Sequence, residues 1–337
     1  MINFIQFIIT RAFLAIITLL AVSFIVFALM ELVPANCAER YLAFKNTQGS
    51  NITIEDIEAE ERRLGLDRPF LVRWSTWVSN IVIKRDFGNS CILRVRINDL
   101  MKDKFILSLG ICLTALLLAY LIAVPVGIIS ATTKFRSLDN ALKLISYLGL
   151  AIPNFLLALI IILFSVVFFG DTMTGLFTPE YVNAPWSFDK FKNFLSRAWL
   201  PIFILGWSAT AFALQTVRAL ISDEYEKLYV VAAKARGISG MTLLWKYPAK
   251  HSLGPIINSL GFDLNRIFNE LPIVALILML TESGALLVES LARTNDQQLA
   301  GAIIILLTGT IIMLNFLTDV LLAVIDPRIR KGVMGGS

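Results

Sequence analysis

Long apolar runs alternate with short polar stretches along this chain, and six of the runs are long enough to cross a bilayer as helices. A helix rises about 1.5 Å per residue, so about 20 apolar residues span a hydrocarbon core of about 30 Å. The runs cover residues 12–33, 105–131, 142–169, 198–221, 254–280 and 299–324. This pattern predicts an all-α, polytopic membrane protein with six transmembrane helices.

Prolines and glycines punctuate the runs. Pro34 follows the first run and is expected to end it, whereas Pro153 breaks the third. Pro125 and Gly127 lie inside the second run, where neighbouring helices in a membrane can satisfy the freed backbone groups. No small-residue cleavage pattern follows the first run, so we expect a retained anchor and not a cleaved signal.

The composition agrees with a membrane class. Hydrophobic residues make up 57% of the 337 positions and charged residues only 16%, which leaves too little charge for the surface of a soluble domain. The net charge of +5 is modest, and in a membrane protein it usually reflects cytoplasmic loops and lipid headgroups. We expect the lipid bilayer as the environment and no nucleic acid as a partner.

Residues 35–104 differ from the rest, because acidic and basic residues are mixed there with few long apolar runs. Ile54, Ile57 and Leu64 recur at helical spacing and predict an amphipathic helix that Gly65 terminates. Trp74 and Trp77 predict a second short helix resting at the membrane interface, and the segment KRDFGN that follows is turn-like. We expect a long extracytoplasmic segment between the first two transmembrane helices.

The distribution of basic residues predicts the orientation, since short cytoplasmic loops carry an excess of Lys and Arg. Six spans place both termini in the cytoplasm. The short inner segments then carry Arg11, Lys134, Arg136, Lys227, Lys234, Lys246, Lys250, Arg328, Arg330 and Lys331, whereas the two short outer loops carry Lys190, Lys192, Arg197 and Arg293. The extracytoplasmic segment is also basic, but loops longer than about 60 residues escape this rule.

These predictions divide the chain into three parts. Residues 1–104 hold the first transmembrane helix and the extracytoplasmic segment, residues 105–325 a five-helix core, and residues 326–337 a cytoplasmic tail. Within the core, residues 222–253 form a polar segment between two spans, which we call the platform.

The platform is predicted to form a helix–turn–helix elbow. Ser222 or Asp223 would cap its first helix, with Glu226 completing a capping box. An apolar stripe follows at helical spacing, Gly237 can stop the helix, and Ser239 is a plausible cap for a second short helix over 241–245. The stripe consists of Leu228, Val231, Ala232 and Ala235. The pattern alone fits either a docking site for a soluble partner or an amphipathic helix lying on lipid.

Charged residues inside the fifth span indicate a second candidate site. Asp263, Arg266 and Glu270 share one helix face, and Asn269 adjoins them. Charges at membrane depth are costly, so this face should meet protein or water. It would line a translocation path or an interface with a partner, or else form a structural ion-pair cluster. Gln215, with Thr216, would line the path or bond between helices, and we favour the bond.

Four further polar residues have simpler interpretations. Glu282 and Glu289 on the last outer loop fit solvated charges better than contacts to a binding protein. Asp319 would pair with a cation of the tail, Arg328 or Arg330, and His251 reads as a satisfied interfacial histidine.

The cysteines and the lone histidine limit the chemistry. One histidine excludes a multi-histidine metal site, and Cys37, Cys91 and Cys112 show no CxxC spacing. Cys37 and Cys91 both fall in the extracytoplasmic segment and would form a disulfide or remain separate thiols; we slightly favour the thiols, because sequence gives no distance. The sequence also lacks a P-loop, HExxH and GxSxG, so we expect no cofactor and no enzyme activity in this chain.

Three motifs resemble one transporter family. The segment YVVAAKARGISGMTLLWKYPAKHSLGPIINSLG resembles the EAA loop of ATP-binding-cassette (ABC) importer permeases, with Ala232, Ala233 and Gly237 at the A-A-x-x-x-G positions and Val231 in place of the leading Glu. ERRLGLDRPFLVRW, followed by DFGNS, resembles the N-terminal part of dipeptide/oligopeptide/nickel-type permeases. DVLLAVIDPRIRKG resembles their C-terminal signature.

This resemblance implies a MetI-like fold and the membrane subunit of a type I importer in the bacterial cytoplasmic (inner) membrane. It implies a second, similar permease, two ATPase subunits that hold ATP and Mg, and an extracytoplasmic solute-binding protein. The loop would dock the ATPase through Tyr229, Ala232, Ala233, Arg236, Gly237, Ser239 and Met241.

The expected function is import of oligopeptides, or of a similar extended solute, by alternating access. Oligosaccharides are the alternative, since the outer loop TPEYVNAPWS resembles a subgroup partly associated with their uptake. A stand-alone secondary transporter is less favoured, because we find no convincing internal repeat. The solute is mainly chosen by the separate binding protein, so this chain need not encode it.

Overall fold

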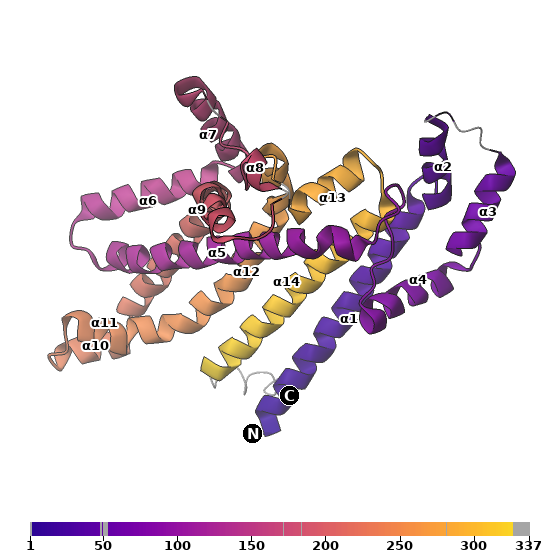
Figure 1. Ribbon diagram of the computed structural model, residues 1–337. Helices are drawn as coiled ribbons and strands as arrows, with labels where there is room; N and C mark the ends of the chain where they lie inside the picture. The colour runs from indigo at the N-terminus through magenta and orange to yellow at the C-terminus, as the bar shows by residue number, and fades with distance from the viewer. Residues whose placement is uncertain are drawn as a thin grey trace. The chain divides into compact units, whose positions relative to one another are not determined.

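The described part of the chain is helical, which confirms the all-α fold class (Figure 1). The structure is a computed structural model that describes residues 2–47, 49, 53–170, 172–182, 184–280 and 282–325. The helices are α1 (Ile2–Leu32), α2 (Cys37–Thr47), α3 (Ile54–Leu64), α4 (Phe70–Ser79), the π-helix η1 (Asn80–Lys84), α5 (Ile97–Thr132), α6 (Arg136–Ala151), α7 (Asn154–Phe169), α8 (Pro179–Val182), α9 (Phe188–Tyr225), α10 (Leu228–Ala235), α11 (Gly240–Lys246), α12 (Pro248–Ile277), α13 (Ser283–Ala292) and α14 (Gln297–Ile325).

Four of the described helices, α1, α5, α9 and α14, are long and apolar enough to cross a membrane. A fifth span exists if the bent pair α6 and α7 counts as one. The fifth predicted span corresponds to α12, which has 30 residues but is not among the four. The protein is therefore a multi-pass membrane protein, and the count of six spans stays a prediction.

The third predicted span is not one continuous helix, because α6 and α7 meet at an angle of 95°. Pro153 precedes α7 and has no N–H for the helical ladder. A proline also pushes the residue before it toward extended backbone, and Ile152 adopts φ −91° and ψ 113°. The bend is the physical consequence of the proline that the sequence shows.

The described residues group into two compact units. The first unit comprises the described residues within Met1–Arg11, Leu109–Leu280 and Leu314–Ser337, and the second unit those within Ala12–Ser108 and Thr281–Met313. The chain thus leaves the second unit at α5 and returns to it only at α13.

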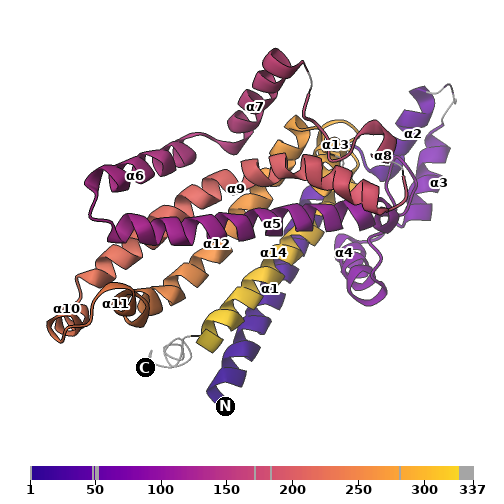
Figure 2. The same ribbon diagram turned by 60° about the vertical axis from the view of Figure 1, so that its left-hand side comes forward.

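In the first unit, α9 packs against α5, α6, α7 and α12. Small residues allow the close approach that helices in lipid use. A Cβ atom added to Gly206 of α9 would lie 3.2 Å from the Ala115 carbonyl oxygen of α5, and one added to Gly127 would lie 2.9 Å from the Val217 side chain. In both views α10 and α11 connect the end of α9 to the start of α12 (Figures 1 and 2).

In the second unit, α1 lies along α14, and α4 packs on α1 through aromatic side chains. Val26 and Phe27 of α1 form a buried cluster with Trp77 of α4 and Ile305 of α14. The short helix predicted around Trp74 and Trp77 is confirmed. Trp77 is buried against protein, however, which corrects the prediction that its indole rests at the membrane interface.

The predicted amphipathic helix is α3, and it has the expected end at Gly65. The Thr53 hydroxyl accepts from the Asp56 backbone N–H, and the Asp56 carboxylate accepts from Thr53 N at 2.9 Å, which completes a capping box. Gly65 adopts φ 68° and ends the helix. No residue of α3 is fully buried, although the helix packs against α2 and Ile57 of its apolar face is half-buried.

A disulfide joins Cys37, at the start of α2, to Cys91, with the two Cα atoms 5.3 Å apart. This corrects our preference for two separate thiols. The turn that carries Cys91 is held a second time by Asp296, whose carboxylate accepts from the backbone N–H of Cys91 at 3.1 Å and from the Ser90 hydroxyl. The same carboxylate accepts from Leu299 N at 3.0 Å, near the start of α14.

Glu60 of α3 carries an ion-pair cluster with two arginines of the second unit. Its carboxylate accepts from Arg63 at 2.8 Å and from Arg94. Hydrogen bonds from these guanidinium groups lower the pKa of Glu60 to about 2. Glu60 is therefore ionised under all ordinary conditions and neutralises both arginines in part.

The interpretation of Glu282 is wrong, whereas that of Asp319 stays a prediction. Glu282 is fully buried and is not a solvated charge, because it accepts from Gly284 N at 2.7 Å and Ala285 N at 3.0 Å and caps α13. Burial raises the pKa of its carboxyl. Asp319 pairs with Arg11 at 3.2 Å, whereas its expected partners, Arg328 and Arg330, lie with Lys331 in the tail 326–337, outside the described residues.

We predict that thiol labelling of the unreduced, denatured protein modifies Cys112 and leaves Cys37 and Cys91 unmodified. Replacing both bridged cysteines by serine should destabilise the second unit by about 4 kcal/mol, because the bridge closes a long loop in the unfolded chain. Mass spectrometry after alkylation, with and without reductant, measures the first effect, and the rate of proteolysis within residues 37–91 measures the second. Three labelled cysteines without reductant would contradict the bridge.

We also predict a pH-dependent effect of Glu60→Gln. The folded-state pKa of Glu60 lies below its ordinary value of 4.5, so its stabilisation is complete above about pH 4.5 and is lost as the pH falls toward 2. At pH 7 the variant should be less stable than the wild type by about 1–3 kcal/mol, and the difference should shrink between pH 5 and pH 3. Thermal melts across this range measure it, with Glu58→Gln on the same helix as control.

Candidate functional site

The platform contains two short helices, α10 and α11, which with the turn between them we call the elbow (residues 228–246). The predicted start of the first helix is wrong: α9 continues through Ser222 and Asp223 to Tyr225, so neither residue caps α10. The chain turns at Lys227, whose extended backbone has ψ 142°, and α10 begins at Leu228. The long preceding helix therefore carries the elbow directly on its end.

The elbow turns sharply at the expected residues. Gly237 adopts φ 84°, a conformation that costs glycine little, and its N–H donates to Lys234 O at 2.9 Å. Ser239 occupies the N-cap position of α11, as predicted, although its side chain makes no capping hydrogen bond. Gly237 and Ser239 are both exposed, so the turn itself is free to meet another molecule.

The inner side of the elbow is packed. Val230 and Ala233 of α10 are fully buried against Leu243 of α11. Leu244 packs in a second cluster with Val217 and other residues of α9 and α12. Ala233, which the resemblance assigns to docking, lies on this packed side, where its small size serves contact between α10 and α11 within this chain.

The outer side of the elbow is apolar and uncovered in this chain. Leu228 is 86% exposed, Met241 65%, Trp245 57% and Val231 49%. Ala232, Ala235 and Arg236 are exposed beside them. The predicted apolar stripe exists, and it faces away from the described protein.

Tyr229 joins the elbow to α12. Its ring lies 5.0 Å from the His251 ring and 6.2 Å from the Tyr247 ring, and its hydroxyl donates to Glu224. His251, read from the sequence as a satisfied interfacial residue, thus contacts the first turn of α10. These contacts fix the orientation of the elbow relative to α9 and α12.

The charged residues of α12 make bonds across the first unit. Asp263 is buried, and its carboxylate accepts from the Tyr120 hydroxyl of α5 at 2.8 Å. Arg266 lies 4.0 Å from Asp263 and donates to Ser208 O of α9 at 3.3 Å. These contacts give each charge a protein partner, as its depth in an apolar helix bundle requires.

Glu270, the third charged residue of this face of α12, is hydrogen-bonded to Asn154, the first residue of α7. The Asn154 side-chain amide donates to the Glu270 carboxylate, to the Ser208 hydroxyl at 3.1 Å and to Leu205 O at 3.4 Å. Asn269, in contrast, is exposed. The structure thus ties Asp263, Arg266 and Glu270 into the bundle and leaves Asn269 at its surface.

Gln215 of α9 bonds to the next helix, since its side-chain amide donates to the Ser146 hydroxyl of α6. One turn further, Arg218 forms two hydrogen bonds to Asp139 of α6, at 2.7 and 2.9 Å, and Lys143 approaches the same carboxylate at 2.6 Å. Asp139 was expected in a loop and lies instead in the first turn of α6.

Sequence reasoning missed the uncharged partners in these clusters, namely Tyr120, Asn154, Ser208 and Ser259. A signal was present: Tyr120 and Asn154 are isolated polar residues within apolar runs. Within the ranges that the structure describes, no group of three His, Cys, Asp or Glu residues could hold a metal ion.

Comparison with known proteins identifies relatives along the whole chain. The family model described as "Binding-protein-dependent transport system inner membrane component" matches residues 123–331, and a second model for the N-terminal part of such membrane components matches residues 4–95. The chain is 27% identical over 326 residues to the oligopeptide transport system permease protein AppB of Bacillus subtilis, covering 96% of this chain and 99% of that protein.

Two further likenesses extend this result. The glutathione transport system permease protein GsiC of Escherichia coli K12 is 27% identical over 325 residues, covering 96% of this chain and 99% of that protein. A solved structure of the MetNI methionine ABC transporter in inward-facing conformations aligns with TM-score 0.53 and 16% identity, covering 67% of this chain and 96% of that chain. The second likeness confirms the expected MetI-like fold.

We predict that glutamate has very different effects on stability at two neighbouring positions of the elbow. Ala233→Glu places an unpaired charge in the Val230–Leu243 contact and should destabilise the elbow by about 3–5 kcal/mol. Ala232→Glu places the same charge at the surface and should change the stability little. Hydrogen–deuterium exchange over residues 228–246 measures both; equal protection in the two variants would contradict the packing described.

Proposed function

Since the chain belongs to the binding-protein-dependent transport system inner membrane components and is a permease subunit of an ABC importer, we propose that it carries oligopeptides into bacteria by alternating access. It is a transport component and not an enzyme, and it works with ATPase and solute-binding partners. The observation that supports the mechanism best is the apolar outer side of the elbow, which the chain itself leaves uncovered.

In this proposal the elbow is the coupling element. Leu228, Ala232 and Met241 enter a groove on an ATPase subunit, with Tyr229, Arg236, Gly237 and Ser239 at its margin. Tyr229 and Leu244 connect the elbow to α9 and α12, so a displacement of the elbow is transmitted to both long helices. ATP and Mg are bound and hydrolysed on the ATPase subunits, in line with the absence of a P-loop from this sequence.

The assembly that we propose has a second, homologous permease subunit, two ATPase subunits and an extracytoplasmic binding protein. Both termini and the elbow lie in the cytoplasm, and residues 35–96 lie outside the bacterial cytoplasmic (inner) membrane. The disulfide in this outer segment fits an oxidising compartment. The cationic residues of the elbow fit the cytoplasmic side.

We assign different roles to the polar residues of the spans. Asp263, Arg266, Glu270 and Gln215 brace the bundle beside the translocation path through their bonds to α5, α6, α7 and α9. Asn269, which is exposed, faces the path or the second permease. Bracing residues of this kind would let α7, α9 and α12 move together when the path opens.

The relatives favour peptides as the solute. Two are named as permeases for oligopeptides and for glutathione, which is itself a small peptide. A third, SapB of Escherichia coli K12, 26% identical over 276 residues, is named for putrescine export. An ATP-dependent uptake assay on the reconstituted complex, with labelled tripeptides, labelled tetrasaccharides and putrescine compared in parallel, tests the choice of solute.

We predict that Ala232→Glu and Leu228→Glu reduce ATP-dependent uptake at least tenfold and release the ATPase subunits during purification. A charge on this face would be buried unpaired in the ATPase groove. Ala59→Glu, also at an exposed alanine of a helix, is the matched control and should leave both unchanged. Full uptake and normal ATPase co-purification by the two elbow variants would defeat the proposal, as would uptake by the isolated chain without ATP.

A further inference from the structure

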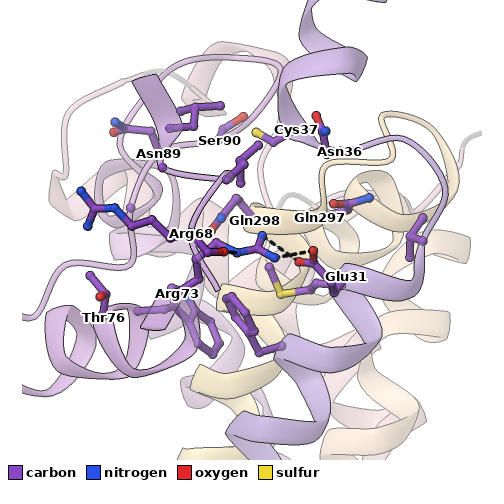
Figure 3. A pocket seen from close by; sticks show the side chains of 18 of the residues that line it. Glu31, Asn36, Cys37, Arg68, Arg73, Thr76, Asn89, Ser90, Gln297 and Gln298 are labelled. Carbon is purple, nitrogen blue, oxygen red and sulfur yellow. Dashed lines mark hydrogen bonds and ion pairs between the residues drawn. The ribbon is translucent and has the colours of Figure 1, made fainter. Parts of the chain in front are cut away.

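A cavity of about 830 Å³ opens in the second unit, among the end of α1, the end of α3, α4 and the start of α14 (Figure 3). Its volume falls within the range of about 300–1,000 Å³ that is usual for small-molecule sites. Nothing in the coupling mechanism uses it. The side chains that line it differ sharply from those of the helix bundle, because most of the polar ones are basic or are amides.

The cavity has an excess of positive charge. Five arginines line it, Arg62, Arg63, Arg68, Arg73 and Arg94, whereas Glu31 is the one carboxylate among the lining residues. Figure 3 shows Glu31 paired with Arg73. Glu60, which lies outside the lining, already holds Arg63 and Arg94. Among the described residues, no carboxylate lies within ion-pair distance of Arg62 or Arg68.

Arg94 has a buried hydrogen-bond donor without an acceptor. Its guanidinium lies 3.7 Å from the centroid of the Tyr41 ring and bonds to Glu60, so its position is fixed. Its Nε atom is nevertheless buried and has no hydrogen-bond partner among the described residues. A buried donor without an acceptor is destabilising, and an acceptor on a bound molecule would satisfy it.

The rest of the lining is suited to a ligand that is only partly polar. Phe27, Met30 and Trp77 contribute apolar surface, and Asn89 and Gln298 contribute amides that both donate and accept. Arg62 and Arg68 are exposed and have no carboxylate partner among the described residues, and two such guanidinium groups in a cavity with apolar lining match a carboxylate attached to an apolar body. Arginine is the residue best suited to this, because its planar fork binds a carboxylate through two parallel hydrogen bonds.

We propose that this cavity is an anion site that binds the free C-terminal carboxylate of a short peptide, with Arg62 and Arg68 as its carboxylate-binding residues. The anion site stands on the charges and the volume alone, whereas the choice of a peptide rests on the proposed function. The site gives the permease its own contact with the solute, separate from that of the binding protein. A phospholipid headgroup offers the same anionic chemistry, and the experiment separates the two.

The test uses the full-length chain in nanodiscs of phosphatidylcholine and a labelled apolar tripeptide, in equilibrium dialysis. The free acid should bind, and the C-terminal amide of the same tripeptide should bind at least tenfold more weakly. The double variant Arg62→Gln/Arg68→Gln should lose at least tenfold in affinity for the acid, because two charge-assisted contacts disappear. Arg85→Gln, an exposed arginine of the same unit outside the cavity, is the matched control and should bind as the wild type does.

Equal binding of acid and amide, or unchanged binding by the double variant, overturns the proposal. The lipid alternative is tested in nanodiscs that contain phosphatidylglycerol. If native mass spectrometry finds this lipid retained by the wild type and lost from the double variant while no tripeptide binds, the site is a lipid site and the peptide assignment is overturned. Uptake by the whole complex is measured separately: uptake without this binding overturns the site alone, and binding without ATP-dependent uptake counts against the proposed function alone.

Discussion

The hydrogen bonds of the Asn154 side-chain amide are the interactions that join α7, α9 and α12 in the first unit. This amide stands directly after the Pro153 break and donates to two groups of α9 and to the Glu270 carboxylate of α12. The proline break bends an apolar helix pair by 95°. Polar backbone groups and charged side chains near the bend then need hydrogen-bond partners within the protein, because water is scarce among such helices. One polar residue at the bend therefore joins three helices. In the same way, the hydrogen bond from the Tyr120 hydroxyl to the Asp263 carboxylate joins α5 to α12.

The second unit relies on buried carboxylates at helix starts. Glu282 caps α13 and accepts from the Ser108 hydroxyl, and Asp296 caps α14 and accepts from the Ser90 hydroxyl. Each acid thereby satisfies free N–H groups at a helix N-terminus and fixes a distant segment at the same time. The part of the second unit between α1 and α5 has a folded arrangement for this reason, although no residue of α3 is fully buried.

The sequence predicted the helical class, the amphipathic α3 with its Gly65 end, the turn at Gly237 and the apolar stripe of the elbow, because these follow from local spacing and backbone preference. It failed where a partner lies far away in the chain. Asn154 and Tyr120 were passed over, Glu282 was read as solvated, and the Cys37–Cys91 bridge was not preferred, since sequence holds no distances. Ala233 shows a subtler limit: the motif required a small residue there, but only packing could tell whether it faces a partner or the neighbouring helix.

The position of Asp296 has a consequence for how the protein is made. The turn at Ser90–Ile92 depends on a carboxylate that follows Cys91 by 205 residues. During synthesis, Cys37 and Cys91 therefore leave the ribosome long before the residue that fixes the geometry between them. The second unit consists of the beginning of the chain and a late segment, so it is completed only after the helices of the first unit have been synthesised. An oxidant acting early would close the bridge on an unfinished second unit, and quality control that tests this unit would in effect be testing whether α14 has been inserted.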